Sequence, residues 1–147
     1  MGDQVLHHRE RIEKETQGMR APGLLESHYA PKKRLIVLPA AIEKMMSKPN
    51  LPLQGVKRVA CLSFFGNPKT LSETLSEILE LPVEVRTLSE KQDWCEAGKN
   101  FFQTLRALDA SEGEVLLSEP ISTNEIESNG IAYAIADRLR RASAPKK

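Results

Sequence analysis

The sequence has almost no excess of charge: 21 Lys and Arg residues stand against 20 Asp and Glu residues, which leaves a formal net charge of +1. A chain this balanced has no global field with which to attract nucleic acid or an anionic membrane surface. It also lacks any apolar run near the ~20 residues that cross a bilayer. Its first residues, Met1–Gln4, contain no apolar stretch like that of a secretory signal. We therefore expect no direct nucleic-acid partner and no membrane partner.

Cysteine and histidine are scarce as well. Two Cys without a secretory signal indicate a reducing, cytoplasmic location and no disulfide framework, and we expect Cys61 and Cys95 to lie in regular elements. His7 and His8 are adjacent, so their rings point apart along a helix, and no cluster at metal-ligand spacing stands beside them. No Ser-His-Asp or Cys-His arrangement can be identified. We predict no metal site and no catalytic residue in this chain.

Three segments follow one another along the chain. Residues 1–20 are mostly charged or polar and form an arm with few apolar residues. Residues 21–33 form a linker, and residues 34–143 carry the apolar pattern of a folded domain. An isolated helix with so thin an apolar face is marginal in water, so we expect the arm to be flexible or to depend on a partner.

Apolar runs and helical stripes alternate along the domain. Runs typical of buried strands occupy residues 34–38, 56–62, 83–88 and 114–118. Helical patterns occupy residues 39–48, 70–79, 93–108 and 130–141. Such alternation requires right-handed crossovers between parallel strands. It predicts a small Rossmann-like three-layer α/β domain, with a mostly parallel sheet, helices on both faces and an irregular linker arm before it.

Two details of the helices can be tested. Thr70 and Glu73 have the spacing of a capping box and predict that a helix begins at Thr70, as Asp93 and Glu96 do for the next helix. In the first predicted helix, which Pro39 opens, the residues expected to face inward are Ile42, Met45 and Met46.

The linker carries unusual chemistry for a connector. Pro22 and Gly23 form a turn pair, and Pro31 favours extended geometry before it. Between them stand His28 and Tyr29, which can both donate to and accept from a phosphate or a carboxylate. The alternative is an exposed loop whose tyrosine packs on the edge of the domain.

Two loops follow the carboxyl ends of predicted strands, where open parallel sheets bind ligands. In the first, Gly66, Asn67, Lys69 and Thr70 precede or open a helix, whose N-terminus can hold an anion or a nucleotide phosphate on backbone N–H groups. The loop lacks the Gly-x-x-x-x-Gly-Lys-Ser/Thr spacing of nucleotide-binding loops, and an ordinary capped helix start is the alternative. The second loop, residues 118–129, is either solvated or the wall of a cleft or partner surface.

Three blocks of sequence together carry a resemblance to a known family. They are residues 21–31, with Ala-Pro-Gly and then His-Tyr-Ala-Pro; residues 99–109, ending in Leu-Arg-Ala-Leu-Asp; and residues 130–142, Gly-Ile-Ala-Tyr-Ala-Ile-Ala-Asp-Arg-Leu-Arg-Arg-Ala. In this order they resemble the interdomain linker and two helices of long-form threonylcarbamoyl-AMP synthases, in which a YrdC-like catalytic domain precedes a smaller C-terminal domain. The chain departs from the family at Leu24, where Met is usual, and at Glu26-Ser27, where basic or aromatic residues are usual.

The resemblance implies an accessory domain. The family joins L-threonine, bicarbonate and ATP into threonylcarbamoyl-AMP, which feeds the threonylcarbamoyladenosine modification of tRNA. That catalysis, with its ATP and Mg, belongs to the YrdC-like domain, so we expect no cofactor and no activity in this chain alone. The implied partner is a YrdC-like domain, in cis or in trans, whose active site the linker covers with Pro22, Gly23, His28 and Tyr29. Two alternatives are a small nucleotide- or anion-binding regulator that uses the Gly66 loop, and a pure protein-interaction module.

Overall fold

The structure, a computed structural model, describes residues 30–144. The predicted arm and the linker as far as Tyr29 therefore lie outside the described residues. The regular elements, in chain order, are β1 Leu35–Val37, the 3-10 helix η1 Ile42–Lys44, β2 Val59–Ser63, α3 Pro68–Leu79, β3 Val83–Thr87, α4 Trp94–Asp109, β4 Val115–Ser118, α5 Thr123–Ser128 and α6 Gly130–Ala142.

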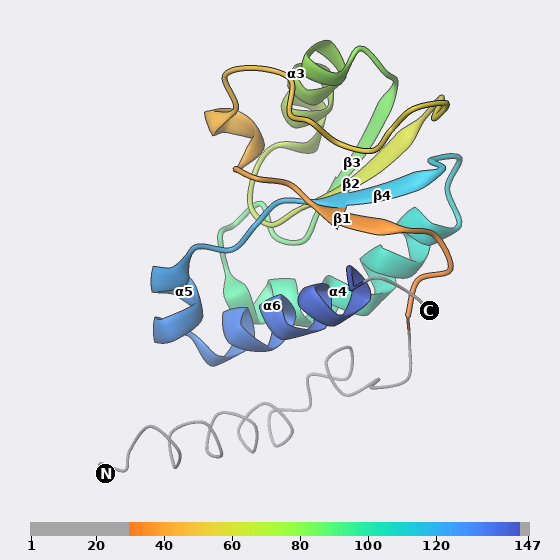
Figure 1. Ribbon diagram of the computed structural model, residues 1–147. Coiled ribbons are helices and arrows are strands. Elements are labelled where there is room, and N and C mark those ends of the chain that lie inside the picture. Colours follow the sequence, from red (N-terminus) through yellow and green to blue (C-terminus); the bar gives the residue numbers. More distant parts are fainter. Residues whose placement is uncertain (1–29, 145–147) are drawn as a thin grey trace, which may run out of the picture.

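All four strands are parallel, and their order in the sheet is β1-β4-β2-β3. Strand β4, one of the two internal strands, pairs with β1, where Leu116 lies opposite Leu35, and with β2, where Val115 lies opposite Val59. Helix α3 and η1 cover one face of the sheet, and α4 and α6 cover the other (Figure 1). The predicted three-layer α/β domain is confirmed.

Two apolar cores lie on the two faces of the sheet, because successive side chains of a strand point in opposite directions. In β2, Ala60 and Leu62 join the core under α4 and α6, whereas Val59 and Cys61 join the core under α3 and η1. All five residues of β2 are buried. Such a continuously buried strand is typical of a parallel sheet that helices cover on both sides.

The predicted helix at residues 39–48 is wrong. The segment contains only the single turn η1, whose preceding residue Ala41 is extended, with ψ 147°, and makes no side-chain cap. Only Ile42 is fully buried; Met45 is half-buried and Met46, predicted to face inward, is 95% exposed. A helix needs a buried stripe for its stability, and one inward residue does not supply one.

Two further boundaries differ from the prediction. Helix α3 begins at Pro68 rather than at Thr70, because the side chain of Asn67 caps it and proline suits the first helical position. The segment 118–129 is not all loop: Ser122 caps the short helix α5. In contrast, Asp93 caps α4 as predicted, accepting a hydrogen bond from the backbone N–H of Cys95.

Both cysteines lie in regular elements and are free, Cys61 buried in β2 and Cys95 exposed on α4. Between residues 30 and 144, no helix combines the length and the apolar character that a membrane crossing requires. The same residues contain no group of three or more His, Cys, Asp or Glu side chains arranged to hold a metal ion.

Gly113, just before β4, is where the fold tolerates a side chain least. A Cβ at this position would lie 2.6 Å from the backbone nitrogen of Ala60, in the middle of the sheet. We expect Gly113→Ala to lower the free energy of unfolding by about 1–3 kcal/mol, because the added methyl would overlap the backbone of β2, which is paired on both sides and cannot move aside. Denaturant unfolding measures this. Gly66→Ala is the comparison, since its added methyl would meet the end of the Leu71 side chain rather than backbone, and a larger loss in Gly66→Ala than in Gly113→Ala would contradict the explanation.

Candidate functional site

The carboxyl edge of the sheet is held together by one buried carboxylate, that of Glu119. This residue directly follows β4 and is 8% exposed. Its Oε2 accepts a hydrogen bond from the backbone N–H of Ile42 at 2.9 Å. Its Oε1 accepts from the hydroxyl of Ser63 at 2.8 Å and from the backbone N–H of Phe64 at 3.4 Å. Glu119 thus joins the chain segments that leave β1, β4 and β2.

Cys61 lies in the same region but is not a nucleophile. Burial raises the pKa of its thiol well above the ordinary value, and the negative charge of Glu119 adds to the rise. The thiolate is the reactive form of cysteine, and the raised pKa keeps the thiol protonated at neutral pH. Cys61 is therefore a small apolar side chain of the core.

The Gly66 loop brings its predicted residues together at the start of α3, but its polar groups are engaged within the chain. Asn67 Oδ1 accepts from the N–H of Thr70 at 3.0 Å. The N–H of Gly66 donates to Ser63 Oγ at 3.4 Å, and the carbonyl of Gly66 accepts from the hydroxyl of Thr87 at 2.6 Å. Lys69 is exposed. An anion site on this loop stays a prediction, and the geometry is that of a capped helix start.

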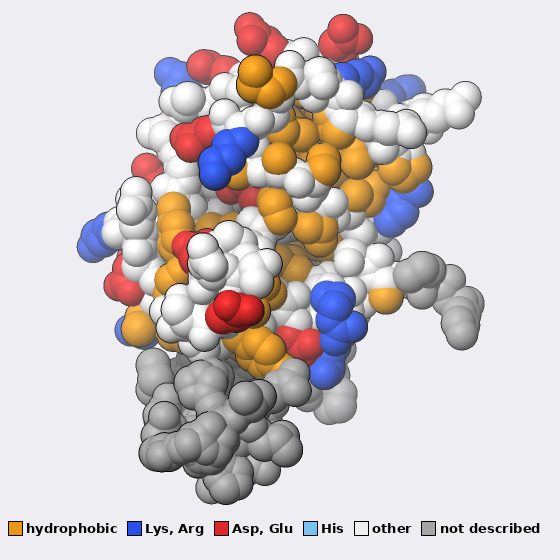
Figure 2. All heavy atoms as spheres, turned by 60° about the vertical axis from the view of Figure 1, so that its left-hand side comes forward, with side chains coloured by type: hydrophobic (Ala, Val, Ile, Leu, Met, Phe, Trp, Pro, Cys, Tyr) orange, Lys and Arg blue, Asp and Glu red, His pale blue; other side chains and the backbone are white. Residues whose placement is uncertain are grey.

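A cavity of about 550 Å³ lies between the end of β1, the segment after β4, and helices α5 and α6. Its lining is mostly apolar, and it includes Val37, Pro120, Ile121, Ile126 and Leu139. Glu119 forms part of its wall. Figure 2, in which the carboxyl edge of the sheet comes forward, shows apolar side chains gathered on this face between charged ones.

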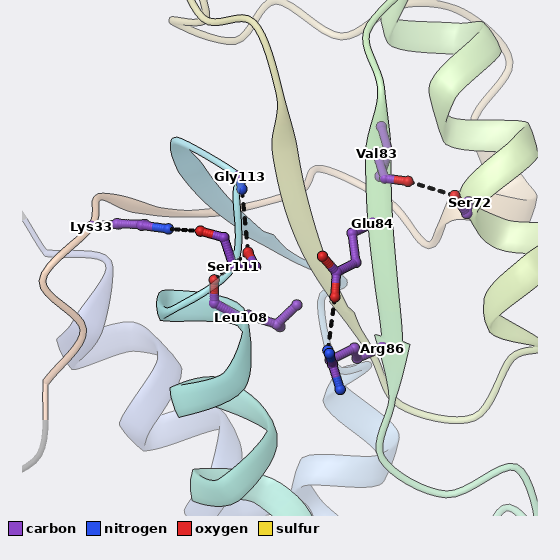
Figure 3. A network of polar contacts seen from close by, with 8 residues as sticks. All are labelled: Lys33, Ser72, Val83, Glu84, Arg86, Leu108, Ser111 and Gly113. Atoms are coloured by element: carbon purple, nitrogen blue, oxygen red, sulfur yellow. Dashed lines mark hydrogen bonds and ion pairs between the residues drawn. The ribbon is translucent and has the colours of Figure 1, made fainter.

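The last residues of the linker are fixed to the end of α4. The backbone N–H groups of Lys32 and Lys33 donate to the carboxylate of Asp109, at 2.9 and 3.1 Å. The ammonium of Lys33 also donates to the carbonyl of Ser111 at 2.7 Å (Figure 3). A carboxylate in the last turn of a helix opposes the helix dipole, and the two N–H donors of the linker offset this cost at Asp109.

The family model described as "Threonylcarbamoyl-AMP synthase, C-terminal domain" matches residues 3–144. The chain belongs to this family. The match begins within the predicted arm and includes the linker, as well as the α/β domain. No curated protein sequence matches the chain at a significant level.

The second and third sequence blocks of this threonylcarbamoyl-AMP synthase C-terminal domain lie against each other, on α4 and α6. The guanidinium of Arg138 lies 5.6 Å from the centre of the Phe102 ring, which is a cation–π contact. Asp137 pairs with Arg140 at 2.9 Å and with Arg141 at 3.2 Å, so part of the basic end of α6 is neutralised within the helix.

Of the predicted linker residues, Pro22, Gly23, His28 and Tyr29 lie outside the described residues. Sequence reasoning included Glu119 in the possible cleft wall 118–129 and Asp109 in the block 99–109, but it predicted no contact for either side chain or for Ser63. A signal existed for two of them: Glu119 directly follows a buried strand, and Asp109 stands at a helix end where an acidic side chain is unfavourable.

We predict that Asp109→Ala releases the base of the linker. The backbone amides of Lys32 and Lys33 should exchange hydrogen faster, and the free energy of unfolding should fall by about 1 kcal/mol, since one of the two bonds is exposed. Hydrogen exchange with residue resolution measures the first effect. The control is Glu112→Ala, which removes an exposed pair with Arg58 and should change stability by less than about 0.5 kcal/mol. Unchanged exchange at both lysines would contradict the assignment.

Proposed function

We propose that this domain is the accessory domain of a threonylcarbamoyl-AMP synthase and that its linker covers the active site of a YrdC-like catalytic domain, in cis or in trans. Membership of the family ties the chain to threonylcarbamoyl-AMP synthesis and so to tRNA modification. The accessory role and the covering of the active site go beyond membership. They rest on how the linker is attached.

One observation carries the proposal: the linker leaves the domain from a fixed point. Asp109 holds the amides of two consecutive linker residues, and the ammonium of Lys33 adds a third bond to the carbonyl of Ser111. Asp109 is the last residue of the block 99–109, and Lys32 directly follows the block 21–31 in the sequence, so the linker is anchored at the end of one family-like block just after the other. An anchor of this kind suits a lid, because fixing one end of a segment lowers the entropy lost when it binds a partner.

The chemistry of the linker suits a site that binds ATP, threonine and bicarbonate. His28 and Tyr29 offer an imidazole and a phenol within four residues of Lys32. Both groups can hydrogen-bond to phosphate and carboxylate oxygens. In this proposal the catalytic domain supplies the nucleotide and Mg site, and this chain supplies groups that close it.

The test is reconstitution with a separately purified YrdC-like domain from the same source. Production of threonylcarbamoyl-AMP and release of pyrophosphate are followed for each protein alone and for the mixture, in the presence of ATP, Mg, threonine and bicarbonate. This chain alone should show no turnover above a heat-killed control. The mixture should elute as a complex in size-exclusion chromatography and differ in activity from the catalytic domain alone. Saturable ATP binding by the isolated chain, without a complex, would favour a nucleotide-binding regulator instead.

A further inference from the structure

The donors that surround Glu119 have the arrangement of an anion site. Two are backbone N–H groups, of Ile42 and Phe64, and the third is the hydroxyl of Ser63. They come from two segments that are far apart in the sequence, and they converge on the two oxygens of one carboxylate. Converging N–H and O–H donors of this kind bind carboxylates and phosphates in many proteins.

The place in the fold is the one where parallel sheets bind their ligands. Strand β4 lies between β1 and β2. The chain leaves β1 and β2 toward the face covered by η1 and α3, whereas it leaves β4 toward α5 and α6 (Figure 1). Neighbouring strands whose chains depart to opposite faces open a crevice at their carboxyl ends, and ligands of open α/β sheets occupy it. In this domain the carboxylate of Glu119 lies there.

The carboxylate of Glu119 is held by hydrogen bonds from uncharged groups. In the part of the chain that the structure describes, all three of its donors are uncharged groups. A carboxylate that is 8% exposed would be costly without them, because burial removes most of its hydration. Removing the carboxylate would therefore leave three donors without their acceptor.

We propose that this crevice is an anion-binding cradle that the chain fills with its own Glu119 carboxylate. The chemical class of ligand that the cradle takes is a small carboxylate or another small oxyanion. While Glu119 is in place, a phosphate or carboxylate from solution finds the N–H groups of Ile42 and Phe64 already bound. The cavity beside α6 has Glu119 in its wall, so shortening this side chain joins the cradle to a space that a small anion can enter.

The experiment is chemical rescue of Glu119→Ala by formate. The variant should unfold about 10 °C lower than the wild type in sodium chloride, since three donors lose their acceptor. Sodium formate at the same ionic strength should raise its midpoint by about 5 °C at ten times the dissociation constant. In NMR spectra, formate should shift the backbone amides of Ile42 and Phe64 in the variant and leave them unchanged in the wild type.

The matched control is Glu114→Ala. Glu114 also accepts a hydrogen bond from a backbone N–H, that of Lys57 at 3.0 Å, but on an exposed site at the amino end of the sheet. Formate should not raise its midpoint. Equal responses of the three proteins to formate, or none in Glu119→Ala, would overturn the proposal.

If Glu119→Ala does not fold in chloride, refolding becomes the readout. Recovery of the folded NMR spectrum in formate but not in chloride supports the cradle, and failure in both salts overturns it. Adding Ser63→Ala removes the hydroxyl donor and should weaken the apparent affinity for formate about fivefold or more, as expected for one lost hydrogen bond. These experiments need no catalytic partner, so their failure would leave the proposed accessory function unaffected. Likewise, failure of the reconstitution experiment would leave the anion-binding cradle unaffected.

Discussion

Replacing His28 by Ala is expected to lower the activity of the reconstituted synthase by about 10- to 150-fold while leaving the thermal unfolding of this chain unchanged. The loss of one charge-assisted hydrogen bond costs ~1.5–3 kcal/mol, which corresponds to that range in a binding constant. The bonds of Asp109 to Lys32 and Lys33 fix the linker only a few residues after His28. In the proposed function the imidazole meets the partner's site, so its removal should affect activity rather than the fold.

The comparison that tests this prediction uses Tyr29→Phe and Tyr29→Ala beside His28→Ala. If Tyr29 meets a phosphate or carboxylate of the partner's site, Tyr29→Phe loses activity because it lacks the hydroxyl. If Tyr29 instead packs on its own domain, Tyr29→Ala lowers the unfolding temperature and Tyr29→Phe behaves like the wild type. Equal activity of the wild type, His28→Ala and Tyr29→Phe, with no complex in size-exclusion chromatography, would rule out the lid.

The fold could be predicted wherever burial is periodic along the chain. Helix α3 buries Leu71, Leu75 and Leu79, which the sequence places at intervals of four residues. The prediction was wrong at 39–48, where Pro39 and Ile42 suggest a helix but only one residue is fully buried. The start of α3 was misplaced because Thr70 and Glu73 have the spacing of a capping box. In the structure the cap is Asn67, whose side-chain oxygen accepts a hydrogen bond from the N–H of Thr70.

The polar contacts of the site could not be predicted, because they join residues far apart in the sequence. Glu119 meets Ile42 across 77 positions, and Asp109 meets Lys32 across the same separation. Local patterns carry no information about such pairs until the order of strands is known. Here the order β1-β4-β2-β3 places the end of β4 between the ends of β1 and β2, which is what brings Glu119 to both neighbours.

The block 99–109 contains buried residues that stabilise the fold and exposed residues that do not. Measurements of stability should distinguish the two kinds. Phe101 is fully buried in the core under α4, in edge-to-face contact with Phe102. We expect Phe101→Ala to lower the free energy of unfolding by about 3–5 kcal/mol, because a cavity replaces the ring. That is a large part of the 5–15 kcal/mol typical of a domain. Denaturant unfolding measures the loss.

Gln103, exposed on the same helix, provides the matched control. Gln103→Ala should change stability by less than about 0.5 kcal/mol, as is usual for surface substitutions. Reconstituted activity in Phe101→Ala should then fall only as far as its folded fraction falls, because the ring lies inside this domain and cannot touch a partner. A loss of activity under conditions where Phe101→Ala is fully folded would instead show that the packing of α4 affects the position of the linker, which Asp109 binds at the end of this helix.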